Sequence, residues 1–462
     1  MVELRLDEIA AKISGRILQG DPSHLFHKFN IDSRLSEQGE LFFALVARRN
    51  GHDFIPDASA NGAQGAVISQ EVPRPARDFA LVRVTDTVAA LQTLAKAVLR
   101  DHPIKIIGIA GSIGKTTTKE FIACLLSRQF KVHKSEGNYN NYLGLSLSLL
   151  KISPDHEVAV LEMGTSAPGE ILGLTQIAPP DVSVITNINP VHLEFFHTLE
   201  AIAKAKKEIL EGTKKGGLAI LNGDDPMVQN IARDWKGAKI TFGLSSGCDV
   251  RASSVQKRGL KGLDFDLHLE RQKEKVHFRF LYEDYLYNLL AAVGACHAFS
   301  VPFEDIVRRI SHLKPFSRRG CLIPLGRKTK LIDDSYNSNP KALEGALKGL
   351  ADLRAKRKVA VLGDMLELGE KETEFHIRAG EQVVEYGWDV LITIGPLSLH
   401  LAEGALSAGI DQNDIFSFSN SEEAAEKIPS LIHEGDLVLV KGSRGIKTER
   451  VVEKLKEEFK EN

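Results

Sequence analysis

Short apolar runs recur along the middle of the chain, and polar residues follow each of them. The runs lie at 106–110, 158–163, 182–188 and 218–222. Stretches with helical periodicity separate them. Continuous apolar runs of this length are typical of strands buried on both faces of a parallel sheet. After them, residues 248–280 alternate apolar and charged positions, which predicts an antiparallel meander at one edge of the same sheet.

The same alternation of strands and helices returns in the last third of the chain. Apolar runs begin there near residues 330, 359, 390, 414 and 436. The first hundred residues hold shorter runs at 42–46 and 66–69, among turn-forming residues. We therefore predict an α/β protein of three domains, with a small N-terminal α/β domain at 1–100. A central doubly wound sheet with the meander spans 101–314, and a Rossmann-like doubly wound C-terminal domain spans 315–462.

Composition narrows the class of protein. At 462 residues the chain is too long for one ordinary core; 43% of it is hydrophobic and 26% is charged. A formal net charge of −2 gives no sign of a nucleic-acid or anionic-membrane partner. The four cysteines are far apart, which is typical of reduced thiols rather than of disulfides or a zinc site. With no signal-peptide pattern and no apolar run near ~20 residues, we expect a soluble, cytoplasmic protein.

A glycine-rich loop follows the first run of the middle block. Residues 108–120 read GIAGSIGKTTTKE, and the segment 117–127 has the pattern of a helix. The glycines could serve only tight turns. However, a strand, a glycine loop, Lys-Thr and a helix in this order let backbone amides surround a phosphate. We expect Lys115 to pair with the β- and γ-phosphates of a nucleotide and Thr116 to bind Mg²⁺. The generic loop pattern would require Gly at 109, where Ile stands.

Other polar residues also stand directly after predicted strands, where open α/β sheets bind ligands. Glu162 ends one apolar run and His192 follows the next. A strand-end carboxylate can simply face water, and a lone histidine is usually structural. Beside a phosphate loop, however, a metal-facing role for Glu162 is favoured, because Mg²⁺ takes few protein oxygens and shares those of phosphates. By spacing alone, Lys204 and Lys206 would be a solvated helix face, and Asp334 an ordinary strand end.

Taken together, these stretches resemble the Mur ligase family, the ATP-dependent amide-bond enzymes of peptidoglycan precursor synthesis. The family pattern G-x-x-G-x-x-G-K-[ST]-[ST] fits residues 108–117, where the generic pattern does not. Within the family the chain resembles the branch that joins D-alanyl-D-alanine to UDP-N-acetylmuramoyl-tripeptide. The stretches that carry this resemblance are 31–34, 40–45, 51–54, 136–144, 161–171, 186–194, 203–209, 333–343, 362–369 and 440–452. The Asp-Asn-Pro-Arg motif of the branch that adds the third residue is absent.

The resemblance implies specific roles. It assigns catalysis to Lys115, Glu162, His192 and Lys206. Contacts with ATP are assigned to Gly111, Ser112, Gly114, Lys115, Thr116, Thr117, Asn288, Arg319, Asp334 and Asn337. Two Mg²⁺ ions would be held by Thr116, Glu162, His192 and Lys206, the lysine being carbamylated by CO₂ so that it offers an anionic oxygen. The peptide and sugar substrates would contact Ser33, Arg34, Asn138, Asn141, Thr165, Ser166, Tyr336, Lys441, Ser443 and Arg444.

The implied reaction phosphorylates a carboxylate with ATP, and the amine of the dipeptide then displaces the phosphate. We expect a monomer with small-molecule substrates only, no nucleic acid and no membrane insertion. Where the family usually has G-x-H-N, this chain has Tyr282-Glu283-Asp284-Tyr285, and Ala47 stands where glycine is usual. The third residue of the acceptor peptide, lysine or diaminopimelate, stays open. A folate polyglutamylating ligase and a nucleotide-binding switch are the alternative functions.

Overall fold

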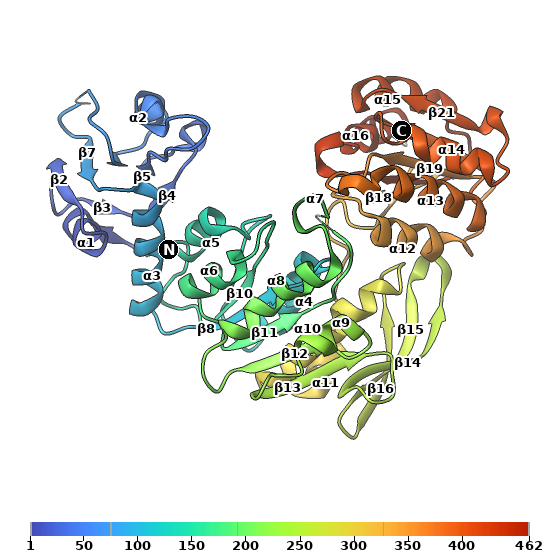
Figure 1. Ribbon diagram of the computed structural model, residues 1–462, viewed down its shortest axis with the longest axis horizontal. Coiled ribbons are helices and arrows are strands. Elements are labelled where there is room, and N and C mark those ends of the chain that lie inside the picture. Colours follow the sequence, from blue (N-terminus) through green and yellow to red (C-terminus); the bar gives the residue numbers. More distant parts are fainter. Residues whose placement is uncertain (1, 74–75, 192, 327, 461–462) are drawn as a thin grey trace.

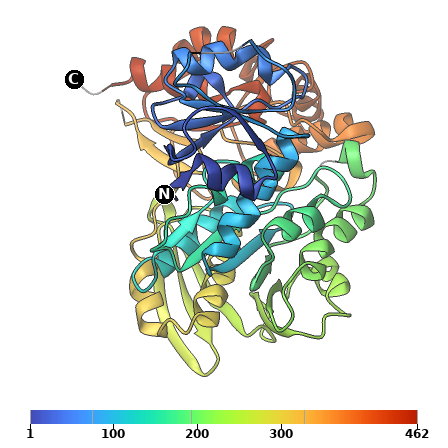
Figure 2. The same cartoon turned by 90° about the vertical axis from the view of Figure 1, so that its left-hand side faces the viewer.

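The computed structural model describes residues 2–73, 76–191, 193–326 and 328–460. The chain forms three α/β bodies, each built around its own sheet (Figure 1). The N-terminal and C-terminal bodies rise from the same side of the middle one, at its two ends (Figures 1 and 2). The predicted three-part α/β fold is confirmed.

The N-terminal sheet has five strands in the order β2-β7-β6-β5-β4, of which only β2 runs antiparallel to its neighbour. Its strands are β2 (Arg16–Gln19), β4 (Lys28–Asn30), β5 (Glu40–Phe43), β6 (Gly65–Ile68) and β7 (Ala80–Arg83). A short antiparallel ladder pairs β1 (Leu4–Arg5) with β3 (Leu25–Phe26). The helices are α1 (Leu6–Lys12), α2 (Ile55–Ala60) and α3 (Thr87–Asp101). Asp86 caps α3 by accepting hydrogen bonds from two amides of its first turn.

The middle sheet has nine strands in the order β16-β15-β14-β13-β12-β11-β8-β10-β9. Its parallel part consists of β8 (Lys105–Ala110), β9 (Val132–Lys134), β10 (Val158–Glu162), β11 (Val182–Ile185), β12 (Leu218–Asn222) and β13 (Ala238–Gly243). The predicted meander is present at one edge as β14 (Val250–Lys257), β15 (Leu263–Leu269) and β16 (Gln272–Phe278).

Helices cover both faces of the middle sheet, as its continuous apolar strands require. One face packs against α5 (Tyr142–Leu149), α6 (Glu170–Ile177), α8 (Leu199–Glu211) and α9 (Pro226–Ile231). The other packs against α4 (Lys115–Leu126), α10 (Asp284–Ala298) and α11 (Phe303–Ile310). Successive residues of a strand point to opposite faces of the sheet, so Ile106 lies in the first core and Ile107 in the second.

The C-terminal sheet has six strands in the order β17-β18-β22-β19-β20-β21, parallel except for β17. Its strands are β17 (Cys321–Pro324), β18 (Lys330–Asp334), β19 (Lys358–Gly363), β20 (Val390–Ile394), β21 (Ile415–Phe418) and β22 (Leu437–Lys441). The helices α12 (Pro340–Leu350), α13 (Glu372–Glu385) and α14 (Leu399–Ser407) cover one face. The helices α15 (Ser421–Lys427) and α16 (Glu449–Glu458) cover the other.

Packed contacts join the three bodies. Helix α3 lies against α5, and their leucines share one apolar core. On the other side, Leu281 and Tyr282, just before α10, are buried in the C-terminal core with Leu343 of α12. The short helix α7 (Leu193–Phe196) contacts the 3₁₀ turn Gly369–Lys371 of the C-terminal body. In the described ranges, no helix has the length and apolar character needed to cross a bilayer.

Two strands are shorter than the apolar runs from which they were predicted. The run 42–46 forms a strand only to Phe43, and the run 182–188 only to Ile185. In the second case, the backbone amide of Thr186 still donates to the carbonyl of Ala110 at the end of β8 (3.1 Å), while the side chains of Thr186 and Asn187 donate to the carbonyl of Ile113 in the glycine-rich loop.

Candidate active site

The glycine-rich loop lies at the carboxyl end of β8, the central strand of the parallel part of the sheet. Gly111 has φ +141° and Gly114 has φ +84°, both in the left-handed region that other residues rarely adopt. Helix α4 begins immediately afterwards, at Lys115. Its first amides, which lack partners within the helix, therefore point into the loop and provide an anion site.

The segment that follows β11 fixes the shape of this loop. The Oγ1 of Thr186 donates to the carbonyl of Ile113 (2.7 Å), and the amide of Ile113 donates to Oδ1 of Asn187 (2.9 Å). Ser112 is held likewise, because its hydroxyl donates to the carbonyl of Asn189 (3.0 Å). Gly111 must be glycine here, because a Cβ would lie 2.0 Å from Oγ1 of Thr186.

Lys115 is folded back over the loop. Its Nζ donates to the carbonyls of Gly111 (2.8 Å) and Ser112 (3.1 Å). Enclosure by the protein lowers the pKa of Lys115, with the Glu162 carboxylate opposing the shift and the Arg319 cation adding to it. A phosphate at the loop would supply the anionic partner that this ammonium lacks.

Thr116 and Glu162 form the second feature of the site. The Oγ1 of Thr116 donates to Oε2 of Glu162 (2.7 Å), and the side-chain amide of Asn140 donates to Oε1 (2.9 Å). Glu162 is only 4% exposed, so its carboxylate depends on these partners for solvation. A hydroxyl beside a carboxylate, next to a phosphate site, is an oxygen donor set suited to Mg²⁺. The described residues contain no group of three or more His, Cys, Asp and Glu that could hold a metal by themselves.

A cavity of about 400 Å³ lies between the loop and the C-terminal body. Fifteen of the residues singled out in the sequence line it: Ser112, Gly114, Lys115, Thr116, Thr117, Asn138, Glu162, Asn288, Arg319, Asp334, Tyr336, Asn337, Lys441, Ser443 and Arg444. The carboxyl ends of both parallel sheets therefore face one space.

The C-terminal wall of the cavity is built around a buried ion pair. Nζ of Lys441 lies 2.6 Å from Oδ2 of Asp334, and it also donates to the carbonyl of Asn337 (3.0 Å). Burial raises the pKa of Asp334, although Lys441 pulls the other way. The Arg319 guanidinium stacks over the Tyr336 ring at 4.0 Å, and Arg444 approaches the same ring at 5.8 Å.

Asn288 lies beneath the phosphate loop. Its Oδ1 accepts from Oγ1 of Thr118 (3.2 Å), and a Cβ on Gly114 would stand 2.1 Å from that oxygen. The unusual stretch before it forms the joint with the C-terminal body. Tyr282 and Tyr285 stack with ring centroids 5.5 Å apart, and the Tyr285 hydroxyl donates to the carbonyl of Arg319 (2.9 Å).

Lys206 is buried on α8, with 1% of its surface exposed. Among the described residues, its amine makes no hydrogen bond and no ion pair, unlike Lys115. Burial, helped by the nearby Lys115 cation, lowers the pKa of Lys206 well below its usual value. The sequence interpretation of this lysine as part of a solvated helix face is therefore wrong.

Several predicted site residues lie away from the cavity. Asn141 caps α5 by accepting from the amide of Gly144 (2.9 Å), while Thr165 and Ser166 are bound by Glu170. The predicted metal ligand His192 lies outside the described residues.

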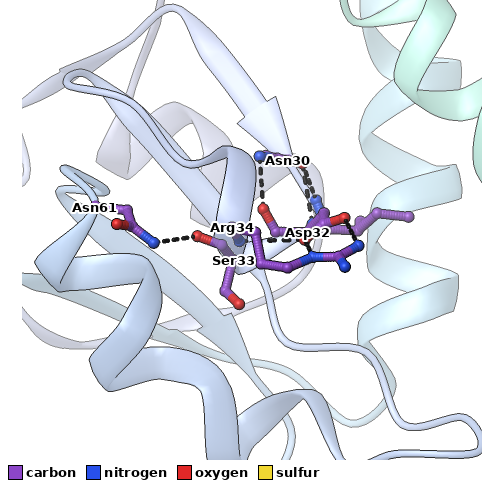
Figure 3. Close-up of polar contacts among 6 residues, drawn as sticks. Asn30, Asp32, Ser33, Arg34 and Asn61 are labelled. Carbon is purple, nitrogen blue, oxygen red and sulfur yellow. Dashed lines mark hydrogen bonds and ion pairs between the residues drawn. The ribbon is translucent and has the colours of Figure 1, made fainter.

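Ser33 and Arg34 belong to the N-terminal body (Figure 3) and do not line the cavity. The Arg34 guanidinium turns back onto Asp32, with Nη2 2.6 Å from Oδ2, and Asn61 donates to the Ser33 carbonyl (3.0 Å). The arginine side chain is 84% exposed, so it is available to a ligand of that domain.

Sequence reasoning missed Asn140 and Lys119. Asn140 stands in the asparagine-rich stretch 136–144, but nothing in that pattern says which asparagine would reach Glu162. Lys119 follows the motif by two residues and reads as an ordinary helix lysine, yet it is fully buried. Only its place one turn after Thr116, on the inner face of α4, could have drawn attention to it.

Comparisons with known proteins agree with this geometry. The pattern of the Mur ligase middle domain matches residues 109–296, and that of the Mur ligase glutamate ligase domain matches 318–444. The UDP-N-acetylmuramoyl-tripeptide–D-alanyl-D-alanine ligase of Bacillus subtilis is 35% identical over 98% of this chain and 99% of its own.

Solved structures of such enzymes have the same fold. A crystal structure of MurF from Acinetobacter baumannii superposes with a TM-score of 0.89 at 29% identity, covering 99% of both chains. MurF ligase from Thermotoga maritima in complex with ADP gives 0.81 at 30% identity, covering 94% of this chain and 97% of its own. With whole-length relatives at this identity and matches to both conserved domains, the chain belongs to the Mur ligase family, in its MurF branch.

Proposed function

We propose that this protein is an ATP-dependent ligase that joins D-alanyl-D-alanine to UDP-N-acetylmuramoyl-tripeptide, releasing ADP and phosphate. The observation that carries the proposal is the single cavity in which the phosphate loop of one sheet faces the Asp334–Lys441 pair of the other. The names of the full-length relatives supply the substrates.

The chemistry explains why such a site needs a nucleotide. A carboxylate resists an amine, because resonance stabilises it and oxide is a poor leaving group. In the proposed reaction a carboxylate oxygen of the tripeptide attacks the γ-phosphorus of ATP, and the bond to the β-phosphate oxygen breaks, giving an acyl phosphate and ADP. The dipeptide amine then adds to the carbonyl carbon, loses a proton, and phosphate leaves.

The residues of the cavity would act mainly by placement and charge. The loop amides and Lys115 would hold the β- and γ-phosphates, and Lys115 would exchange its contacts with Gly111 and Ser112 for phosphate oxygens. Arg319, stacked on Tyr336, would place a second cation opposite the loop. Lys115 and Arg319 both line the cavity in which the negatively charged phosphates and carboxylate would have to bind side by side. Contact of the C-terminal body with the nucleotide would also exclude water from the acyl phosphate.

The oxygen donors fit magnesium. Thr116 and Glu162 would hold one Mg²⁺ with the phosphates, and Glu162, His192 and carbamylated Lys206 a second. When bound, the ions would neutralise phosphate charge and polarise the P–O bonds. The amine of Lys206 is buried and has no partner in the part of the chain that the structure describes. This supports the carbamate, because a depressed pKa keeps a lysine neutral and nucleophilic. Its nitrogen would bond to the carbon of CO₂ and lose a proton, which turns a repelled cation into an anionic ligand.

The remaining assignments complete the proposal. Residues 1–100 would bind the UDP-sugar through Ser33 and Arg34, 101–314 would bind ATP, and 315–462 would bind the dipeptide and close on ATP. Asn138, Asn141, Thr165 and Ser166 would contact the acceptor peptide. Because the acceptor is UDP-linked and the reaction consumes ATP, we propose that the reaction takes place in the cytoplasm. We also propose that the enzyme acts as a monomer.

The test is phosphate release with defined acceptors, followed by mass spectrometry of the product. We expect release only when ATP, UDP-N-acetylmuramoyl-tripeptide and D-alanyl-D-alanine are all present, with a product heavier by the dipeptide less one water. Tripeptides ending in lysine and in diaminopimelate are compared in parallel. Release stimulated by a folate and glutamate would favour the folate ligase, and product-free hydrolysis stimulated by a protein partner would favour a nucleotide switch.

A further inference from the structure

Lys119 is a lysine whose whole side chain lies inside the protein. It lies on α4, one turn after Thr116, and none of its surface is exposed. Its Nζ donates to the carbonyls of Ser135 and Gly137, the latter at 3.4 Å. The nearest carboxylate oxygen within ion-pair distance, Oε1 of Glu120, lies at 3.5 Å. Fully buried lysines are rare, because the ammonium must give up its water.

The two carbonyls belong to the segment between β9 and α5, residues 135–141. This segment crosses the carboxyl end of β10 and is tied to it at both ends. The amide of Ser135 donates to the carbonyl of Val160 (3.1 Å), and the amide of Gly164 donates to the carbonyl of Asn140 (2.8 Å). Between these ties, the ammonium of Lys119 holds the segment from below.

The same segment controls the surroundings of Glu162. The Oγ of Ser135 accepts from the backbone amide of Glu162 (3.2 Å), and Nδ2 of Asn140 donates to Oε1 of its carboxylate (2.9 Å). With Oε1 so occupied, Oε2 faces the hydroxyl of Thr116 (2.7 Å). The orientation of the carboxylate therefore depends on where residues 135–141 lie.

An apolar residue at position 119 could not hold this segment. Gly137 adopts φ +49°, and a Cβ there would touch nothing within 4 Å, so packing does not fix the chain at this residue. An ammonium has three donors and can gather two carbonyls that diverge from a tight turn.

We propose that Lys119 is a positioning residue that holds residues 135–141 so that Asn140 orients the Glu162 carboxylate toward the divalent cation. The inference rests on the proposed function in one respect, the cation-binding role of Glu162. Residues that orient a metal ligand typically change metal affinity 10–100-fold when they are removed. The Lys119→Met variant should therefore weaken cation binding without contacting the cation.

The test measures binding of Mn²⁺ to the protein–ADP complex, with free Mn²⁺ followed by electron paramagnetic resonance. We expect Lys119→Met and Asn140→Ala each to weaken Mn²⁺ binding about tenfold, and the double variant to be little worse than either. Affinity for a fluorescent ADP analogue in EDTA should stay within about twofold, whereas a general disruption of the loop would lower both affinities. Lys134→Met is the matched control, because that lysine also pairs with Glu120 but is 45% exposed on β9; it should change neither affinity.

Glu162→Gln separates the two levels of the proposal. If it leaves Mn²⁺ affinity unchanged, the cation role of Glu162 fails and the inference falls with it. If Glu162→Gln weakens Mn²⁺ binding while Lys119→Met does not, only the role of Lys119 is overturned; additive losses in the double variant would overturn it as well. Should Lys119→Met show no cooperative thermal transition, Lys119→Gln, which keeps one N–H donor for the Ser135 carbonyl, should lose less Mn²⁺ affinity than Asn140→Ala; a loss as large as that of Asn140→Ala would overturn the role of the Ser135 contact.

Discussion

Replacing Gly114 with alanine tests how tightly the phosphate loop is packed. Gly114 precedes α4 with φ +84°, and an added Cβ would lie 2.1 Å from Oδ1 of Asn288. The left-handed backbone alone costs an alanine about 1–2 kcal/mol. In addition, the loop or Asn288 must move by about 1 Å, and a misplacement of that size can lower a rate about 100-fold. We expect kcat/KM for ATP to fall by about two orders of magnitude.

A matched glycine separates backbone strain from the contact with Asn288. Gly216 has φ +80°, close to that of Gly114, but a Cβ there would meet nothing within 4 Å. Gly216→Ala should lose a similar 1–2 kcal/mol of unfolding free energy, seen as a fall in Tm of a few degrees, with ATP kinetics unchanged. The assay pairs steady-state phosphate release with thermal unfolding by circular dichroism. If Gly114→Ala retains wild-type kcat/KM, or if Gly216→Ala loses as much, the packing of the loop on Asn288 does not control nucleotide use.

Three further outcomes are expected. Lys115→Met should abolish phosphate release, because it removes the cation of the loop, yet leave the circular dichroism spectrum unchanged; residual turnover above a few per cent would contradict its role. Lys206→Ala should be inactive, and added formate or acetate should restore part of the activity by replacing the carbamate oxygen; an unimpaired variant would exclude that group. Burial lowers the pKa of His133 to about 4. The unfolded chain binds this proton more readily than the folded one, so the free energy of unfolding should decrease as the pH falls. The loss from this group should be about 2 kcal/mol between pH 7 and pH 5. Urea unfolding at both values should show that difference shrinking in His133→Gln; an equal loss in both proteins would refute it.

The sequence predicts most of the architecture because buried parallel strands are continuous apolar runs. Runs such as 158–163 mark β10 to within a residue. The prediction fails at strand ends, where apolar character continues but hydrogen bonding changes. Residues 186–188 stay apolar or neutral, yet the strand ends at Ile185, and the side chains of Thr186 and Asn187 bond the phosphate loop.

The phosphate loop was predictable for a different reason, since its residues are contiguous and their order follows from the chemistry. The rest of the site comes from contacts between distant segments. That Asn288 lies beneath Gly114, that Asn140 rather than Asn138 reaches Glu162, and that Lys206 is buried all depend on how α10, the 135–141 segment and α8 pack. Local periodicity cannot report such burial, because a lysine on an amphipathic helix has the same pattern whether its tip reaches water or not.

The central claim is that one cavity, shared by the middle and C-terminal bodies, holds the nucleotide whose phosphate activates a carboxylate. A crystal structure with Mg²⁺ and a non-hydrolysable ATP analogue tests it most directly. The account predicts the triphosphate on residues 111–117, with Lys115 turned from the Gly111 carbonyl onto phosphate oxygens and the cation between Thr116 and Glu162. A triphosphate bound elsewhere, with Lys115 still folded on its own loop, would contradict it.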